Sequence, residues 1–387
     1  MKLKDKILKI GKNAKIASKE LAKTSSQTKN DALLAMAQSI NNEKKIILEA
    51  NKEDVNNAKE NNISEAFIDR LELNIERIDQ IIKTLNEIAS FKDPVGRVLD
   101  SWSRPNGLQI SRVSTPLGVV GIIYESRPNV TSDIASLCFK SGNPVILKGG
   151  SEAYFSNLIL SKLFRKSLKK NKVDENFVQF INVKNKNLVD FLLTRMGKFI
   201  DVIIPRGGKS LVTKVQKFSK IPIIGHLEGI CHTYLDKDAD LNMSIKVVHN
   251  AKLRNTSICG ATETILIHKK VLKKFSNPIL NKLAISNCKI IGDKKLKKYY
   301  KGKIYLAKEK DWSTEYLSAT VSVKCVKNLE SAIEHVNKYG TMHTDSIITK
   351  NSKNAQIFLN GVNSSIAMHN TSTQFADGGE FGFGGEI

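Results

Sequence analysis

The sequence predicts an α/β fold built on a parallel, doubly wound sheet. Apolar runs typical of strands buried on both faces occur in VVGIIYES, NPVILKGGSEA, FIDVIIPRGGKS and IPIIGHLEG. Helical stretches such as SNLILSKLFRKSLKK and LVDFLLTRMGK lie between these runs, and that alternation is typical of a parallel sheet covered by helices. A chain of 387 residues is too long for one hydrophobic core, so two or three domains are expected.

Residues 1 to about 90 are predicted to form several amphipathic helices. Apolar residues recur there at helical spacing, as between Leu33 and Ile40. Acidic residues occur early, at Asp5 and Glu20, which favours a folded helical start over a removable presequence. The motif FKDPVGRV closes this region.

The sequence pattern that follows predicts β-strands. From Leu108 the segment LQISRVSTPLG alternates apolar and polar residues, which predicts a hairpin near residues 107–118.

Two of the apolar runs end in paired glycines beside lysines, in the segments 148–151 (KGGS) and 206–210 (RGGKS). Glycines at the carboxyl ends of strands let the phosphates of a dinucleotide approach the backbone, and a helix N-terminus attracts them. The full GxGxxG pattern is absent, and ordinary strand-to-helix turns also use glycine. A nucleotide site and two plain turns therefore both remain open at this point.

Cys259 is the strongest candidate nucleophile. It lies in NTSICGATETILI, on a short turn flanked by serine and glycine and followed by a predicted strand. Arg254 and the polar residues 255–257 offer a cation and hydrogen-bond donors that favour thiolate over thiol. The alternative is that Cys259 is an inert, small apolar packing residue.

The other cysteines are predicted to be packing residues. Cys138, Cys288 and Cys325 lie in apolar or lysine-flanked contexts without a comparable turn. Cys231 is followed by His232, but neighbouring residues of a strand point to opposite faces, so that imidazole is not expected to contact the sulfur. With five cysteines and no CxxC pair, a disulfide framework is not expected and a reducing cytoplasm is favoured.

The composition is that of a globular protein with an unusual positive charge. The net charge is +23, and the basic residues are mostly scattered lysines, which is typical of a solvated surface. A nucleic-acid surface more often groups arginine with aromatic residues, so nucleic-acid binding is the least favoured alternative. No apolar stretch reaches the roughly 20 residues of a membrane span. The seven histidines are dispersed along the sequence, and no metal site is expected.

Six separated motifs carry a family resemblance across essentially the whole chain. They are PLGVVGIIYESRPNVTSDIASLCFKSGNPVILKGGSEA, PRGGKSLV, HLEGICHTYLD, NAKLRNTSICGATETIL, GTMHTDSIIT and NTSTQFADGGEFGFG. In this order they closely resemble the γ-glutamyl phosphate reductases of the aldehyde dehydrogenase superfamily.

The resemblance implies an aldehyde dehydrogenase-like fold with three parts. Residues 1–225 would hold the N-terminal helices and a Rossmann-type dinucleotide-binding domain, with the hairpin as a small β oligomerisation element. Residues 226–350 would form the α/β catalytic domain that carries Cys259. Residues 351–387 would return to the cofactor and oligomerisation region.

The resemblance also implies the reaction. The family reduces L-glutamyl 5-phosphate to L-glutamate 5-semialdehyde with NADPH, releasing phosphate, in the second step of proline biosynthesis from glutamate. A cytoplasmic location, a homo-oligomer and a pathway partnership with glutamate 5-kinase follow as expectations. The alternatives are another semialdehyde oxidoreductase of the same superfamily, and the basic nucleic-acid-binding protein considered above.

Roles for individual residues follow from the same resemblance. Cys259 would form a thioacyl enzyme, and Asn129 together with the Cys259 backbone N–H would hold the oxyanion. The residues expected to bind the cofactor are Lys148, Gly149, Gly150, Ser151, Gly207, Gly208, Lys209 and Glu315. The residues expected to contact the substrate are Arg127, Arg254, Ser372, Thr373 and Phe375.

One departure from the hydrolytic aldehyde dehydrogenases is informative. Those enzymes use a glutamate to activate water, whereas alignment here puts His226 nearer that position than Glu228. A reductase that handles an acyl phosphate benefits from excluding water, because hydrolysis would destroy the thioester. His343 in GTMHTD also belongs to the family pattern, but no role follows for it from the sequence.

The sequence ends at Ile387, just after FGFGGE. The family usually continues through a basic stretch to a final β segment that pairs with the oligomerisation hairpin. An unpaired hairpin edge and a weakened oligomer are therefore expected for this form.

Overall fold

The computed structural model describes residues 3–125, 127–183, 185 and 187–385. Their contacts divide the chain into two compact units, Met1–Gly225 with Gly384–Ile387, and His226–Phe383. Within the described residues no helix is both long and apolar enough to cross a bilayer.

The first unit is built on a parallel sheet that has four strands within its described residues, in the order β5-β4-β3-β6. Val120 on the central strand β3 lies opposite Val145 on β4 and Val202 on β6. Three of the apolar runs thus form neighbouring buried strands, as predicted. The strands are β3 (Val120–Tyr124), β4 (Val145–Gly149), β5 (Val178–Phe180) and β6 (Val202–Arg206).

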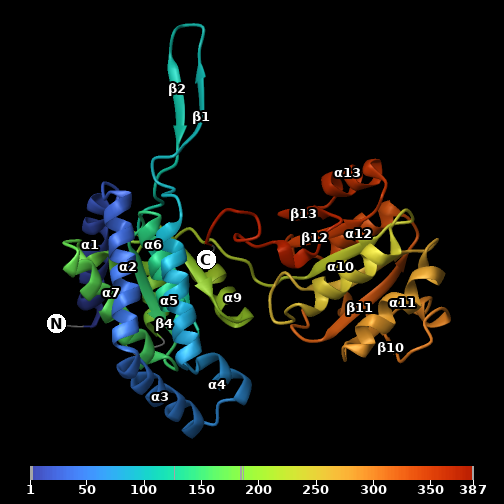
Figure 1. Cartoon of the computed structure of the whole chain (residues 1–387), viewed down its shortest axis with the longest axis horizontal. Coiled ribbons are helices and arrows are strands. Elements are labelled where there is room, and N and C mark those ends of the chain that lie inside the picture. Colours follow the sequence, from blue (N-terminus) through green and yellow to red (C-terminus); the bar gives the residue numbers. More distant parts are fainter. Residues whose placement is uncertain (1–2, 126, 184, 186, 386–387) are drawn as a thin grey trace. The chain divides into compact units, whose positions relative to one another are not determined.

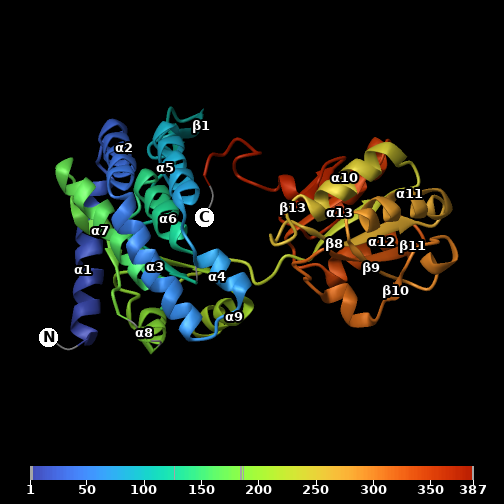
Figure 2. The same ribbon diagram turned by 60° about the horizontal axis from the view of Figure 1, so that its bottom comes forward.

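Helices cover both faces of this sheet (Figure 2). Successive side chains of a strand point to opposite faces, so Ile122 packs with α2 and α5–α7, while Ile123 packs with α1, α8 and α9. The predicted helical start is confirmed by α1–α5. The helices are α1 (Leu3–Leu21), α2 (Ser26–Asn42), α3 (Lys44–Glu60), α4 (Glu65–Leu71), α5 (Ile75–Ser90), α6 (Pro128–Lys140), α7 (Tyr154–Lys170), α8 (Asn187–Arg195) and α9 (Lys209–Phe218).

The fourth apolar run, IPIIGHLEG, was expected to be a buried strand, and that prediction is wrong. Only one bridge forms there, between Ile203 and Ile223. Pro222 has no N–H to donate, and Gly225 packs closely on the ring of Pro205, so the chain leaves the sheet edge after one pairing.

An antiparallel hairpin leaves the first unit and projects away from its helices (Figure 1). Its strands are β1 (Val98–Ser103) and β2 (Gln109–Val113), with Trp102 opposite Ile110. The hairpin expected near 107–118 was therefore placed too late, because only its second strand falls there. The first strand is exposed along its whole length, so it lacks the one-sided alternation by which strands are recognised.

The second unit is also α/β, with a parallel sheet that has seven strands within its described residues (Figure 1). The strand order is β10-β9-β11-β8-β7-β12-β13. The strands are β7 (Cys231–Leu235), β8 (Thr262–His268), β9 (Lys289–Gly292), β10 (Tyr305–Leu306), β11 (Thr320–Val326), β12 (Thr344–Ile348) and β13 (Ile366–His369).

Helices cover both faces of this second sheet as well. Ile265 of β8 packs in a core with α10 and α11, while its neighbour Leu266 packs in another core with α12 and α13. The strand predicted directly after Cys259 is confirmed as β8, and the predicted doubly wound α/β class holds for both units. The helices are α10 (Leu241–Leu253), α11 (Leu272–Ile285), α12 (Leu329–Tyr339) and α13 (Ser352–Gly361).

Candidate active site

The candidate residues of the first unit follow the carboxyl ends of three neighbouring strands. Arg127 and Asn129 follow β3, the segment 149–151 ends β4, and the segment 207–209 follows β6. Because parallel strands end at the same edge of a sheet, these segments share one edge, which is where open α/β sheets bind ligands.

The turn after β4 is tightly packed at its first glycine. Lys148 is buried, and its Nζ donates to the Gly149 carbonyl at 2.7 Å. Burial lowers the pKa of Lys148, opposed by the charge of Glu152. A Cβ on Gly149 would lie 2.4 Å from Asn157 Nδ2, so only glycine fits there without displacement. Ser151, which follows Gly150, is exposed, and its hydroxyl donates to Glu152 Oε1 at 3.2 Å.

The turn after β6 presents the N-terminus of α9. Gly208 is the residue that precedes the helix, and Lys209 is its first residue. The Gly208 N–H donates to Glu125 Oε2 at 2.8 Å, so a carboxylate already occupies the place where a helix N-terminus attracts an anion. Gly207 and Gly208 are exposed, and the binding of a cofactor pyrophosphate there stays a prediction.

Asn129 and Arg127 line a cavity of about 310 Å³ within the first unit. Asn129 lies in the first turn of α6, and its Nδ2 donates to Asp133 Oδ2 at 2.8 Å. Burial raises the pKa of Asp133 to about 6, and the bond from Asn129 opposes that rise. The further lining residues are Asp69, Arg70, Glu72, Leu73, Arg77, Gln80, Ile81 and Thr84.

The cavity combines cations with carboxylates. Partial burial, together with the charges of Arg70 and Arg206, lowers the pKa of Arg127. Arg77 is engaged by Asp69, at 2.8 Å between Nη2 and Oδ1. A cavity of this volume with guanidinium and carboxyl groups on its walls suits a small zwitterionic ligand.

Cys259 lies in the second unit, at the edge of the sheet where the strands begin. It is half-buried in a turn that ends directly before the amino end of β8. Cys231 begins the neighbouring strand β7, and its Sγ donates to the Cys259 carbonyl at 3.1 Å. His343 immediately precedes β12. The amino ends of three neighbouring strands therefore surround the thiol.

Gly229 supports the Cys259 turn from behind. A Cβ on Gly229 would lie 2.1 Å from the Cys259 carbonyl oxygen, an overlap that only displacement of the backbone would relieve. The Gly229 N–H donates to Glu315 Oε1 at 2.8 Å, which ties Glu315, expected to bind the cofactor ribose, to the back of the turn.

The STQF segment, residues 372–375, holds the other side of the turn. Gln374 Oε1 accepts from the Asn255 N–H at 3.1 Å, and its Nε2 donates to the Ala251 carbonyl at 2.9 Å in the last turn of α10. Thr373 is fully buried, and its hydroxyl bonds that of Thr262 at 3.0 Å.

The remaining residues expected to contact the substrate lie around that segment. The Ser372 hydroxyl accepts from the Gln374 N–H at 3.2 Å and is buried. The Arg254 guanidinium lies over the ring of Phe375, 5.3 Å from its centroid, and donates to Glu380 Oε1 at 3.0 Å. Ser372 and Thr373 thus support the loop with their hydroxyls, while Arg254 remains exposed, and substrate contact by these residues stays a prediction.

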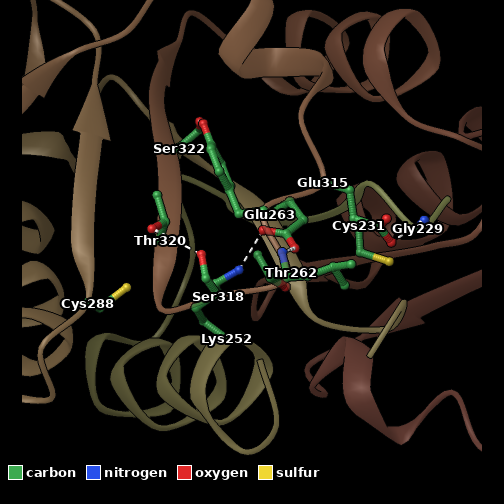
Figure 3. Close-up of polar contacts among 12 residues, drawn as sticks. Gly229, Cys231, Lys252, Thr262, Glu263, Cys288, Glu315, Ser318, Thr320 and Ser322 are labelled. Carbon is green, nitrogen blue, oxygen red and sulfur yellow. Dashed lines mark hydrogen bonds and ion pairs between the residues drawn. The ribbon is translucent and has the colours of Figure 1, made fainter. Parts of the chain in front are cut away.

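Lys252 and Glu263, which lie before and after the Cys259 turn in the sequence, form a buried ion pair, and Figure 3 shows the two side chains. Lys252 Nζ on α10 lies 2.5 Å from Glu263 Oε2 on β8, and both side chains are fully buried. Burial raises the pKa of Glu263 to about 7, and Lys252 opposes that rise. The pair joins the helix before the turn to the strand after it, and Glu263 Oε1 also accepts from the Leu317 N–H at 3.3 Å.

Two histidines that are far apart in sequence lie beside the thiol. One ligand atom from each of His226, Cys259 and His343 lies within 4.8 Å of the other two. The two rings are nearly perpendicular, with centroids 5.0 Å apart. Burial and the charge of His226 lower the pKa of His343 to about 4, so its imidazole is neutral near neutral pH. The dispersion of histidines in the sequence therefore gives no guide to their grouping in the fold.

The His232 side chain points away from the sulfur of its neighbour Cys231, as predicted, and its Nδ1 lies 2.8 Å from Asp345 Oδ1. No role was predicted for His343, and its Nδ1 lies 3.7 Å from Cys231 Sγ. Sequence reasoning also missed Gly229, Gln374 and the Lys252–Glu263 pair. The pair left one recognisable signal, since a lysine and a glutamate flank the cysteine motif within otherwise buried elements.

Comparison with known proteins identifies the family. The model described as "Aldehyde dehydrogenase family" matches residues 3–300. An acetylating aldehyde dehydrogenase from Geobacillus thermoglucosidasius shares the fold, with a TM-score of 0.67 at 15% identity over 98% of this chain and 88% of that one. The chain belongs to the aldehyde dehydrogenase family, whose members use a nicotinamide cofactor.

More similar relatives narrow this assignment. The γ-glutamyl phosphate reductase of Brucella suis biovar 1 (strain 1330) is 46% identical over 98% of this chain and 90% of its own length. That of Bartonella henselae is 48% identical over 98% of this chain and 91% of its own length. The crystal structure of γ-glutamyl phosphate reductase from Thermotoga maritima matches with a TM-score of 0.94 at 39% identity, covering 98% of this chain and 91% of that one. Within the family the chain groups with the γ-glutamyl phosphate reductases, which confirms the resemblance.

Proposed function

We propose that this protein reduces L-glutamyl 5-phosphate to L-glutamate 5-semialdehyde, with release of phosphate and with NADPH as reductant. The observation that carries the proposal is the 46% identity to a γ-glutamyl phosphate reductase over 98% of the chain. The half-buried Cys259, held in a turn beside neutral His343, is the chemical group that this reaction needs.

Cys259 supplies the nucleophile. Its thiolate attacks the acyl carbon, a C–S bond forms, and the C–O bond to phosphate breaks with the electron pair leaving on the phosphate. His343 and His226 are the nearest bases, since their ligand atoms lie within 4.8 Å of the Cys259 sulfur. The exposed His226 is the proposed acceptor of the thiol proton, because burial lowers the pKa of His343 to about 4 and makes it a weak base.

Negative charge then develops on the former carbonyl oxygen. The Asn129 side chain and the Cys259 backbone N–H are the proposed donors to it. Asp133 holds the Asn129 amide at 2.8 Å and so fixes which way the donor points.

The cavity beside Asn129 suits the amino-acid part of the substrate. Arg127 and Arg70 on its wall match a carboxylate, while Asp133 and Asp69 match an ammonium group. Arg254, beside Phe375 in the second unit, is the proposed partner of the phosphate.

A nicotinamide cofactor, when bound, supplies the hydride that turns the thioester into the aldehyde. Gly207, Gly208 and Lys209 would hold its pyrophosphate at the N-terminus of α9, displacing the Glu125 carboxylate. Lys148 and Ser151, with the glycines between them, would hold the adenosine ribose and the 2′-phosphate that distinguishes NADPH from NADH. Glu315 would orient the nicotinamide ribose.

A reverse assay tests the reaction. Glutamate 5-semialdehyde and NADP are mixed with the protein, with and without inorganic phosphate, and NADPH formation is followed by absorbance. We expect NADPH only when phosphate is present. Formation of NADPH without phosphate would instead favour an oxidising semialdehyde dehydrogenase and overturn the proposal.

The hairpin β1–β2 is the proposed contact between copies of the chain. It exposes Val98, Leu99, Trp102 and Leu108, and a two-stranded ribbon is marginally stable alone in water. Sedimentation of the wild type and of Trp102→Lys tests this idea. We expect an oligomer that the substitution dissociates, and a monomeric wild type would contradict it.

We also propose where the protein is located and which enzyme supplies its substrate. Buried, unpaired cysteines fit a reducing cytoplasm. An acyl phosphate is activated toward water, so the kinase that makes it, glutamate 5-kinase, is the proposed pathway partner.

A further inference from the structure

The thiol of Cys259 and the imidazoles of His226 and His343 form a group of metal-binding side chains. They come from three separate segments of the second unit, each just before or close to the amino end of a strand, and one ligand atom from each lies within 4.8 Å of the other two. His226 is exposed and the other two are half-buried, so an ion can reach the group from the solvent side.

The spacing suits zinc after a small adjustment. Zinc binds imidazole nitrogen at about 2.0–2.1 Å and thiolate sulfur at about 2.3 Å, so two such donors in a tetrahedral site lie roughly 3.3–3.6 Å apart. The donors here are at most 4.8 Å apart, so binding requires them to approach by at most about 1.5 Å.

The surroundings of His343 also suit a metal ligand. Its Nδ1 lies 2.9 Å from Thr344 Oγ1, a contact of the kind that orients metal-binding histidines. Cys231 is not part of the group: it is fully buried, and its Sγ donates to the Cys259 carbonyl at 3.1 Å.

We propose that His226, Cys259 and His343 form a zinc-binding site whose occupancy blocks the enzyme. One Zn–S bond and two Zn–N bonds form, the S–H bond breaks with its proton going to solvent, and water fills the fourth position, with no change of oxidation state. The blocking effect rests on the proposed function, because it follows from Cys259 being the nucleophile. Imidazole nitrogen and thiolate sulfur are both donors that zinc binds, and three protein ligands leave the fourth position to water.

The binding test uses the full chain without substrate. The protein is reduced, stripped of metal, mixed with one equivalent of zinc chloride and desalted, and the retained zinc is measured by elemental analysis. Cobalt chloride, titrated in a parallel sample, reports a thiolate ligand through its charge-transfer absorption.

We expect the wild type to retain one zinc per chain. His226→Asn, His343→Asn and Cys259→Ser should each lose affinity by more than the roughly 10- to 100-fold that loss of an outer-shell partner causes. His226 is exposed, so its replacement leaves the core intact and remains informative if the other variants fold poorly. His249→Asn and Cys288→Ser are matched controls in the same unit and should bind like the wild type.

The activity test separates this proposal from the proposed function. We expect wild-type activity to fall in proportion to bound zinc and to return with EDTA. A wild type that retains no zinc, or equal binding by Cys259→Ser, overturns the zinc site whatever the activity. Zinc binding by a wild type whose turnover survives Cys259→Ser would support the site and overturn the blocking role, together with the proposed mechanism.

Discussion

The two units place their candidate residues at opposite edges of similar sheets. In the first unit they follow the carboxyl ends of β3, β4 and β6, whereas in the second Gly229, Cys259 and His343 precede the amino ends of β7, β8 and β12. The glycine turns of the first unit are largely exposed beyond Gly149. The Cys259 turn is held by Gly229, by Gln374 and by the Lys252–Glu263 pair.

This difference reflects what each edge has to do. A carboxyl edge offers helix N-termini, whose N–H groups bind phosphate if the backbone stays open. The amino edge of such a sheet lacks these helix N-termini, and here the Cys259 turn follows the carboxyl end of α10. A nucleophile at that edge therefore has to be fixed in place by buried contacts, while the phosphate site depends on space being left free.

The largest expected effect comes from the nucleophile itself. Cys259→Ser should lower turnover by a factor on the order of 10⁵–10⁶, as loss of a nucleophile does in other enzymes that form covalent intermediates. Steady-state kinetics of the reverse reaction measure it. Cys288→Ser is the matched control, because Cys288 is buried in the core of the same unit, and it should keep its activity. Comparable turnover by Cys259→Ser would remove the distinction between the two edges.

The second effect concerns the Lys252–Glu263 ion pair, which joins α10 before the Cys259 turn to β8 after it. Lys252→Met leaves Glu263 buried without its partner and should lower the free energy of unfolding by about 3–5 kcal/mol. Combining it with Glu263→Leu should recover most of that loss, because an apolar pair of similar size replaces both charges. Urea denaturation of the two single variants and the double variant measures the coupling. Additive losses would show that the pair does not act as a unit.

The third effect compares one glycine from each edge. Gly229→Ala should lower stability by about 1–3 kcal/mol and also lower kcat, because its Cβ overlaps the Cys259 carbonyl. Gly208→Ala should change stability by less than about 0.5 kcal/mol, because the atom nearest its Cβ is Glu125 Oε2 at 3.7 Å and its φ of −68° is ordinary. Thermal melts and kinetics of both variants suffice. Equal effects would mean that the two turns are equally constrained.

The fourth effect is a dependence of stability on pH. Burial lowers the pKa of His335 to about 2, with help from the charges of His232 and Lys324. The unfolded state takes up a proton near pH 6.5 while the folded state does not, so stability is lost as pH falls below that value. At pH 5 the loss from His335 is about 2 kcal/mol relative to pH 7.

His335→Asn should flatten this dependence, since it removes the titrating group but keeps an acceptor for Lys324. Urea denaturation at pH 7 and pH 5 gives, for the wild type and for the variant, the change of the free energy of unfolding with pH. Glu263 acts in the opposite sense, because its pKa is raised to about 7, but it is present in both proteins and cancels from the difference. Parallel slopes in the two proteins would contradict the assignment to His335.

The sequence predicted those parts of the fold that rest on local pattern. The strands β3, β4, β6 and β8 follow from their apolar runs, and the early helices follow from their spacing. The strand β1 escaped because all of it is exposed, and the run around Ile223 misled because Pro222 allows only one bridge. In both places the pairing partner, rather than the local sequence, decides the outcome.

The candidate site likewise contains residues that the local sequence identifies and residues that only long-range packing brings together. Cys259 and the glycine turns were recognised because each lies in a short motif. Gln374, Gly229 and His343 reach the Cys259 turn from distant segments, and no spacing in the sequence records that approach. Long-range packing determines which residues support a reactive group, so only the three-dimensional structure assigns their contacts.

The overlap that a Cβ on Gly229 would make with the Cys259 carbonyl bears on attempts to redesign this enzyme. A directed library meant to change substrate preference should leave position 229 fixed and vary the cavity wall around Arg70 and Thr84 instead. Any side chain at position 229 overlaps the Cys259 carbonyl group, so variants made there lose stability and turnover whatever the target molecule.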